Sequence, residues 1–109
     1  MSNFQRLRKN WEFQDIIKQK QQLVSKNIVL YFQKAEQFTI GISIPKKNSN
    51  AVMRNYYKRQ VKSILRLIDT SNINYKVVFI ARKTFLHLSF FEKKNEIFKI
   101  IERLRLEKK

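Results

Sequence analysis

The residues of this chain that are most able to do chemistry are cations, and they gather between positions 46 and 66. No acidic residue lies between Glu36 and Asp69, so the segment KKNSNAVMRNYYKRQVKSILR carries one sign of charge. A solvated protein surface normally mixes both signs. Uncompensated cations suit a polyanion, and nucleic acid is the commonest soluble one. The cations are Lys46, Lys47, Arg54, Lys58, Arg59, Lys62 and Arg66.

The spacing of these cations is that of a helix. Ser49 or Asn50 can serve as the N-cap, and the pattern predicts a helix that reaches Leu67 or Ile68. At about 100° per residue, one stripe of this helix is apolar and a second, on the opposite side, is basic. Because like charges one turn apart destabilise a helix, the basic stripe indicates a function. The apolar stripe is Met53, Tyr57, Val61, Ile64 and Ile68; the basic stripe is Asn55, Arg59, Lys62 and Arg66, with Arg54 and Lys58 at the border.

Other kinds of site find little support in the composition. The chain has no cysteine and only one histidine, His87, which argues against disulfides and zinc modules. Acid–base or metal catalysis needs clustered titratable groups, whereas the acids here are few and scattered. Glu12 and Asp15 are interpreted as exposed acids of a short helix. We therefore expect no catalytic residue and assign no metal ligand.

Length and charge define the class of molecule. The 109 residues carry a net charge of +16, and 43% of them are hydrophobic, which is enough to build a core. No apolar run approaches the roughly 18 residues of a membrane span, and the first ten residues lack the apolar centre of a signal peptide. The sequence predicts one domain over residues 1–109 that is cytoplasmic, monomeric when free and without membrane contact.

Hydrophobic patterning predicts an α+β fold around the basic helix. Tyr75–Ala81 is a continuous apolar run, as expected of a central strand that is buried on both faces. Ser25–Gln33 and Gln37–Ile44 are two further predicted strands, and the polar Lys34–Glu36 turn between them favours a hairpin. Pro45 ends the second of these strands.

Two more helices are predicted, one near each end of the chain. The first is capped by Asn10 and runs through Ile17. Ser89 and Glu92 form a capping-box signature for the last helix, in which apolar residues recur at helical spacing to Leu104. The expected architecture is a single-domain sandwich in the order helix, strands, helix, strand, helix. The basic helix and the C-terminal helix pack on the central sheet.

A known family signature matches the basic helix. Asn50-Ala-Val-Met-Arg54-Asn55-x-x-Lys58-Arg59-x-x-Lys62 closely resembles the motif NAVxRNRxKRxxR of the protein subunit of bacterial ribonuclease P. The likeness extends over nearly the whole chain. Its other parts are Leu7-Arg-Lys-Asn-x-x-Phe13, similar to the family's first helix; Val29-Leu30-Tyr31, similar to its first long strand; Gly41-Ile-Ser43 with Lys46-Lys47 before the signature; and Phe79-Ile80-Ala81-Arg82-Lys83 after it.

This resemblance implies a fold and a function. Members of the family form an α+β sandwich with a left-handed βαβ crossover and assist a catalytic RNA that removes the 5′ leader from precursor tRNA. That RNA holds the Mg2+ ions and performs the cleavage, so the protein is an enzyme subunit without catalytic groups. The implied partners are the catalytic RNA subunit of ribonuclease P and precursor tRNA. The leader lies in a cleft between the first helix and the sheet.

The resemblance also assigns residues to these two contacts. The RNA subunit would be bound by Lys46, Lys47, Arg54, Asn55, Lys58, Arg59, Lys62 and Arg66. The leader would be bound by Phe13, Ile17, Tyr31 and Arg82, with Lys26 at the edge of the cleft. Aromatic faces can stack the bases of a single strand of any sequence, while cations follow its backbone.

The chain departs from the family pattern at a few positions. Tyr56 stands where a second arginine is usual, which removes a cation but keeps a surface for stacking. Lys62 replaces a usual arginine, Ser49 a usual glycine, and Ile17 a residue that is commonly aromatic. The family also has one more short strand, for which residues 23–24 are the only candidate.

Two alternatives belong to other classes of protein. A ribosomal protein that binds ribosomal RNA would also be small, basic and α+β. A membrane-surface module would use a basic amphipathic helix, but here the core requires the apolar stripe of that helix. The remaining conspicuous side chains are interpreted as packing residues; they are Trp11, Phe85, Phe90, Phe91 and His87.

Overall fold

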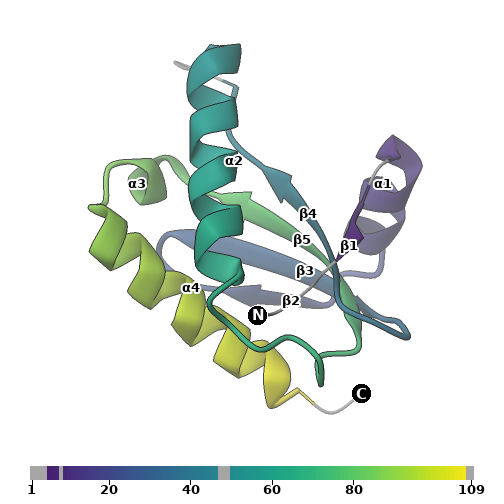
Figure 1. Ribbon diagram of the computed structural model, residues 1–109. Helices are drawn as coiled ribbons and strands as arrows, with labels where there is room; N and C mark the ends of the chain where they lie inside the picture. The colour runs from purple at the N-terminus through teal and green to yellow at the C-terminus, as the bar shows by residue number, and fades with distance from the viewer. Residues whose placement is uncertain (1–4, 8, 47–49, 108–109) are drawn as a thin grey trace.

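A five-stranded mixed sheet in the order β1-β4-β5-β3-β2 organises the fold (Figure 1). The computed structural model describes residues 5–7, 9–46 and 50–107. The strands are β1 (Gln5–Arg6), β2 (Gln22–Val24), β3 (Ile28–Lys34), β4 (Thr39–Ser43) and β5 (Tyr75–Ala81). The helices are α1 (Asn10–Lys18), α2 (Ala51–Leu65), α3 (Lys83–Leu86) and α4 (Phe90–Arg105). None of these helices is long and apolar enough to cross a membrane.

Strand β5 occupies the centre of the sheet, as its continuous apolar sequence predicts. It pairs antiparallel with β3, where Ala81 lies opposite Ile28, and parallel with β4, where Ile80 lies opposite Ser43. The predicted hairpin between β3 and β4 is therefore wrong, because β5 lies between these two strands in the sheet. The polar turn that follows β3 only reverses the chain. Pairing with β5, which is apolar on both faces, stabilises β3 and β4 more than pairing with each other would.

The two faces of the sheet are covered by different helices. Along β5, Val77 and Phe79 belong to the core beneath α2, α3 and α4, whereas Val78 belongs to a smaller cluster beneath α1. This is the alternation expected of a strand. Helix α2 connects β4 to its parallel neighbour β5, so the three elements form the βαβ unit that the resemblance implies. The left-handed sense of that crossover stays a prediction.

Helix α2 begins where the sequence predicts. Asn50 is the N-cap, and its side-chain oxygen accepts a hydrogen bond from the backbone nitrogen of Met53 at 2.9 Å. Three side chains in the second half of the helix, Val61, Ile64 and Leu65, are fully buried. Met53, predicted for the same apolar stripe, is instead exposed. The first turns of α2 extend beyond the sheet, as Figure 1 shows, so only its later turns reach the core.

The C-terminal helix follows its prediction closely. The hydroxyl of Ser89 accepts a hydrogen bond from the backbone nitrogen of Glu92 at 3.1 Å, and the Glu92 carboxylate accepts one from the backbone nitrogen of Ser89 at 3.0 Å. These bonds confirm the capping box. Ile97, Ile101 and Leu104 are buried against the sheet and α2, as their helical spacing predicts.

The N-terminal segment differs from the sequence-based description. Arg6 pairs with Ile40 as part of β1, and the backbone nitrogen of Leu7 donates to the oxygen of Ile40 at 3.0 Å. Leu7 therefore belongs to the sheet edge and not to the first helix. Helix α1 begins at Asn10, with Lys9 as its N-cap. The expected extra strand is present as β2, over the two residues proposed for it and the one before them.

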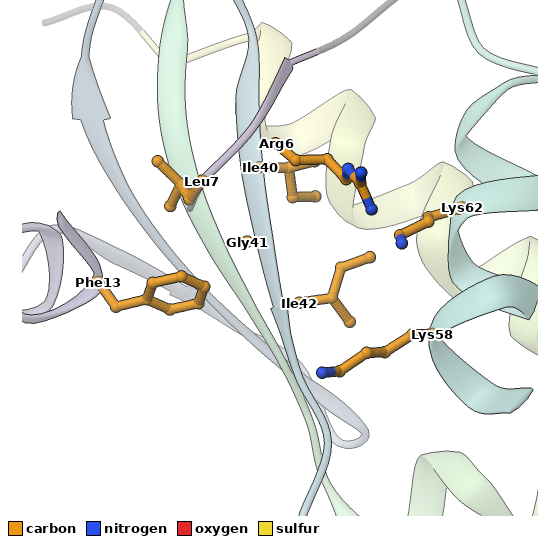
Figure 2. Close-up of a pocket in the computed structure, with 8 residues that line it drawn as sticks. All are labelled: Arg6, Leu7, Phe13, Ile40, Gly41, Ile42, Lys58 and Lys62. Carbon is orange, nitrogen blue, oxygen red and sulfur yellow. The ribbon is translucent and has the colours of Figure 1, made fainter. Parts of the chain in front are cut away.

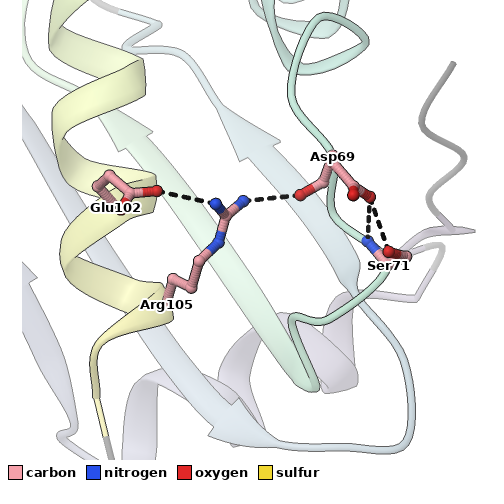
Figure 3. Close-up of polar contacts among 4 residues, drawn as sticks. All are labelled: Asp69, Ser71, Glu102 and Arg105. Carbon is pink, nitrogen blue, oxygen red and sulfur yellow. Dashed lines mark hydrogen bonds and ion pairs between the residues drawn. The ribbon is translucent and has the colours of Figure 1, made fainter.

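A single arginine fastens the connection between α2 and β5 to α4 (Figure 3). The Arg105 guanidinium donates to the backbone oxygen of Asp69 at 2.7 Å and to the Glu102 carboxylate at 2.9 Å. The Asp69 carboxylate accepts from the hydroxyl and backbone nitrogen of Ser71 at 2.7 and 3.0 Å, and these bonds lower its pKa. The loop that follows α2 is thus held against α4.

Helix α1 approaches the sheet closely at one glycine. A Cβ atom at Gly41 would lie 2.3 Å from Cζ and 2.5 Å from Cε2 of Phe13. Distances this short are not tolerated between carbon atoms, so the Phe13 ring occupies the space that a side chain on β4 would need. The absence of a side chain at position 41 is therefore what lets α1 bring its aromatic ring onto the sheet.

Replacing this glycine should reveal the contact. Gly41→Ala should lower the free energy of unfolding by roughly 1–3 kcal/mol, because an overpacked site forces the ring or the helix to move. In a Phe13→Ala background the same change should be close to neutral, since the obstructing ring is gone. Urea unfolding of the four proteins in this double-mutant cycle measures the coupling. Equal costs of Gly41→Ala in both backgrounds would show that the Phe13 ring does not occupy the space beside position 41.

Candidate nucleic-acid interface

A groove follows the edge of β4 and lies between α1 and α2. Strand β1 pairs only with the first two residues of β4, so no described strand lies beside Gly41–Ser43 on that side. A hollow of about 530 Å³ opens there. Phe13 and Ile17 line it from α1, and Arg54 and Lys58 line it from α2. We call this hollow the edge groove.

A second, smaller hollow of about 160 Å³ adjoins the edge groove and shares three of its lining residues, Phe13, Ile42 and Lys58. Figure 2 shows Arg6, Lys58 and Lys62 directed into the space beside Ile42, with Phe13 on the other side of β4. Side chains from β1 and α2 therefore bring three cations together. The strand edge separates these cations from an aromatic ring.

Among the described residues, no acidic side chain forms an ion pair with the cations of the smaller hollow. Partial burial lowers the pKa of Lys62, and the charges of Arg6, Lys58 and Arg66 lower it further. Each of these charged neighbours is a cation, so each disfavours the protonated form of Lys62. A polyanion bound here would reverse that effect, because it would supply the opposite charge at close range. The site thus has the electrostatic character of an anion site.

The structure divides the residues predicted to contact the RNA subunit between two surfaces. Arg54, Lys58 and Lys62 are half-buried and face the two hollows, with the exposed Lys46 beside them. The other members are exposed on the outer side of α2; they are Asn55, Arg59 and Arg66. Lys62 was predicted to project outward with these three, and that placement is wrong because β1 brings Arg6 against its side of the helix. Lys47 lies outside the described residues.

The residues predicted to bind the leader are also divided. Phe13 and Ile17 line the edge groove, where they meet the cations of α2. Tyr31 lies on the same face of the sheet but packs, half-buried, in the cluster beneath α1. Lys26 and Arg82 are exposed at one end of the sheet, where the backbone nitrogen of Arg82 donates to the oxygen of Asn27 at 3.0 Å. Only Phe13 and Ile17 of the five therefore line the edge groove.

Some residues of the interface were not predicted. Arg6 was missed because a two-residue polar strand has no detectable periodicity. Its only signal is its charge. Three other aromatic residues were interpreted as core or helix-end packing, and exposed fractions of 63%, 46% and 68% exclude a core position for Trp11, Phe90 and Phe91. Phe85 is fully buried, which confirms its interpretation as a packing residue.

Metal-ligating side chains are dispersed over the described part of the chain. Across residues 5–7, 9–46 and 50–107, no three His, Asp or Glu side chains gather in the way that holds a metal ion. His87 is exposed at the end of α3. What the arrangement can do is hold a chain of phosphates and present a ring to its bases.

Comparison with known proteins gives one consistent result. A family model described as Ribonuclease P matches residues 1–105. The chain is 53% identical to the ribonuclease P protein component of Mycoplasmopsis pulmonis over 110 residues, which cover 100% of this chain and 99% of that one. It is similar in structure to the RNase P protein of Staphylococcus aureus, with 28% identity and a TM-score of 0.79. That match covers 89% of this chain and 92% of the other. The RNase P protein of Thermotoga maritima is 26% identical and has a TM-score of 0.77, and the match covers 91% of this chain and 96% of that one.

Repulsion among the cations around Lys62 should lower the free energy of unfolding, and removing Lys62 should reveal this effect. Lys62→Ala should leave the free energy of unfolding at neutral pH and low salt unchanged or higher, since it removes a cation that its surroundings repel. Because the folded state lowers the pKa of Lys62, the penalty is complete below the folded pKa and is relieved as pH rises through it. Any gain should therefore shrink at alkaline pH and in high salt. Urea unfolding at two pH values and two salt concentrations tests this.

The neighbouring core residue supplies the control. Val61→Ala should cost roughly 1–4 kcal/mol under every condition, because it opens a cavity beneath the same turn of α2. A Lys62→Ala protein that is clearly less stable at low salt would show that Lys62 is a structural residue.

Proposed function

The chain belongs to the ribonuclease P protein family, and we propose that it binds the catalytic RNA of ribonuclease P together with the 5′ leader of precursor tRNA. Membership makes the chain a component of a tRNA-processing ribonuclease. The observation that most supports the finer proposal is the edge groove. There Phe13 from α1 and the cations of α2 face each other across the free edge of β4. An aromatic ring opposite a row of cations suits a single strand of nucleic acid.

The two surfaces of α2 have different tasks in this proposal. The outer side, with Arg59 and Arg66, contacts phosphates of the folded RNA subunit. The groove side, with Arg54 and Lys58, follows the backbone of the leader while Phe13 stacks on a base. Both surfaces belong to one rigid helix, so the leader and the catalytic RNA are held in a fixed relation. Positioning of this kind lowers the entropic part of a reaction barrier.

The chemistry itself belongs to the RNA in this account. The catalytic RNA binds Mg2+ and cleaves the phosphodiester bond, and the chain contributes cations that reduce repulsion between RNA strands. Protein cations and metal ions then serve partly the same purpose, since both neutralise phosphate charge. The protein should therefore matter most when Mg2+ is scarce. Cytoplasmic location, a monomeric free protein and one RNA-binding unit over residues 1–109 complete the proposal.

The alternatives have lost their support. A ribosomal protein was the main rival, and membership of the ribonuclease P protein family replaces it. A membrane-surface module would need an apolar face free for insertion. The apolar side of α2 instead carries Val61, Ile64 and Leu65, which are fully buried in the core.

The proposed function has a direct test. Cleavage of precursor tRNA by the cognate catalytic RNA should be strongly stimulated by this chain at low Mg2+, and the stimulation should fall as Mg2+ rises. Single-turnover cleavage rates measured over a Mg2+ series, with and without the protein, give the comparison. The double variant Arg59→Ala with Arg66→Ala should shift the Mg2+ requirement upward. A lack of stimulation by the unaltered protein at any Mg2+ concentration would rule the proposal out.

A second test separates the leader contact from the RNA-subunit contact. Phe13→Leu should weaken binding of leader-bearing precursor by roughly 1–3 kcal/mol, the value of one stacked base, and leave binding of mature tRNA unchanged. Arg59→Ala, on the outer side of α2, should weaken assembly with the RNA subunit regardless of the leader. Affinities of the assembled complexes for both tRNAs provide the measurement. Equal weakening of both tRNAs by Phe13→Leu, in a protein that remains folded, would refute the assignment of the leader to the edge groove.

A further inference from the structure

An exposed aromatic ring on the outer side of α2 is held in one orientation. Tyr56 is 47% exposed, although it belongs to the helix that carries the cations. Its hydroxyl oxygen accepts a hydrogen bond from Nε2 of Gln60, one turn further along α2, at 3.2 Å. The ring of Tyr57 stands edge-on to it, with 5.6 Å between centroids and an angle of 61°. A surface tyrosine with no function would not need two such supports.

The Gln60 side chain that bonds to Tyr56 is itself held by a buried lysine of α4. Lys93 is only 3% exposed, and its ammonium donates to Oε1 of Gln60 at 2.7 Å. The same ammonium lies 4.8 Å from the centre of the Tyr57 ring and 5.8 Å from that of Phe85. Burial lowers the pKa of Lys93, as expected of a cation held mainly by ring faces and one amide.

The chemistry of these groups fixes the direction of each hydrogen bond. A lysine ammonium can only donate, so the amide oxygen of Gln60 must face Lys93. The amide nitrogen of Gln60 is then directed at Tyr56, whose hydroxyl accepts the bond. The hydroxyl hydrogen of Tyr56 is left to donate to a partner. Lys93 and Gln60 thus orient the donor at the tip of the Tyr56 ring, and the edge-on contact with Tyr57 restricts the plane of the ring.

The surroundings of Tyr56 identify the chemistry of that partner. Helical spacing places Arg59 three residues further along the same face, and Val52, which is 72% exposed, one turn before it. The ring is therefore continuous with the outer cations of α2. A ligand that covers this surface must carry anionic groups for the cations and a flat apolar face for the ring. An unpaired nucleotide in a folded RNA has both.

We propose that Tyr56 is a stacking platform for an unpaired base of the RNA subunit, with Gln60 and Lys93 as positioning residues. The inference rests on the proposed function, because it names a contact within the same assembly. It adds a contact of a different kind, since stacking depends on ring area and phosphate binding on charge. The hydroxyl of Tyr56 donates to a phosphate or ribose oxygen beside the stacked base.

Salt dependence separates these two kinds of contact. Tyr56→Leu should weaken binding of the RNA subunit roughly five- to 150-fold, the equivalent of about 1–3 kcal/mol for one stacked base. It should leave the slope of log affinity against log salt unchanged, because no cation is lost. Arg59→Ala is the matched control on the same exposed face and should reduce the magnitude of that slope by roughly 0.7–0.9. Tyr56→Phe keeps the ring and should retain most of the affinity.

Fluorescence provides a direct readout of stacking. Trp11→Phe combined with Tyr56→Trp places the only indole of the chain at position 56. Saturating RNA should quench its emission, because the indole stacks on a base. Lys93→Met preserves the apolar packing but releases Gln60. It should weaken RNA binding without changing the salt slope, even though Lys93 is buried beneath the surface and cannot reach the RNA.

The possible outcomes are distinguishable. If the unaltered protein does not bind the RNA subunit, the proposed function fails. If it binds and Tyr56→Leu binds equally well, or the indole at position 56 is not quenched, the stacking inference alone is overturned. A Tyr56→Leu protein that loses affinity together with salt dependence would also overturn it, since the ring would then act through the cations.

Discussion

The burial of one side of α2 is the interaction on which the rest of the structure depends. Val61, Ile64 and Leu65 have no solvent exposure, and burying each such side chain contributes about 1.5–3 kcal/mol. Like charges one helical turn apart cost only about 0.2–0.5 kcal/mol per pair. The apolar contact therefore outweighs the repulsion between the cations on the other sides of the helix. It can hold Lys58 and Lys62 beside Arg6, where burial and charge already lower the pKa of Lys62.

The position of β5 gives this helix its two working surfaces. Because β5 runs parallel to β4, the chain must cross back from the end of β4 to the start of β5, and α2 makes that crossing. One side of α2 then lies along the free edge of β4 and faces α1. The outer side stays open, and Lys93 of α4 reaches Gln60 from beneath to fix the Tyr56 ring. The places of the α2 cations and of the Tyr56 ring thus depend on the position of β5 in the sheet.

The sequence predicts those features that depend on local chemistry. The N-cap at Asn50, the capping box at Ser89 and the central strand all follow from short-range hydrogen bonding or from continuous apolar sequence, and the structure has each of them. The pairing of β3 with β4 was wrongly predicted because a turn signal describes the chain locally. It does not show which strand, far along the sequence, competes for the same edge.

The candidate site was predicted in composition but not in arrangement. Cations of α2 and the ring of Phe13 were both expected, yet their meeting across the edge of β4 was not. It depends on β1, which has only two residues, and on Gly41, whose missing side chain admits the ring. Helical spacing places Trp11 on the side of α1 opposite Phe13, Ile16 and Ile17, so its exposure could have been predicted from the sequence.

The central claim is that the cations beside β4 are crowded in the free protein and are relieved by RNA. NMR titration of the Lys62 side-chain nitrogen, in the free protein and in the complex with the RNA subunit and leader-bearing precursor tRNA, tests it most directly. The account predicts a pKa below the usual lysine range in the free protein and a clear rise when RNA binds, since phosphates replace cations as the nearest charges. A pKa that is the same with and without bound RNA would contradict it.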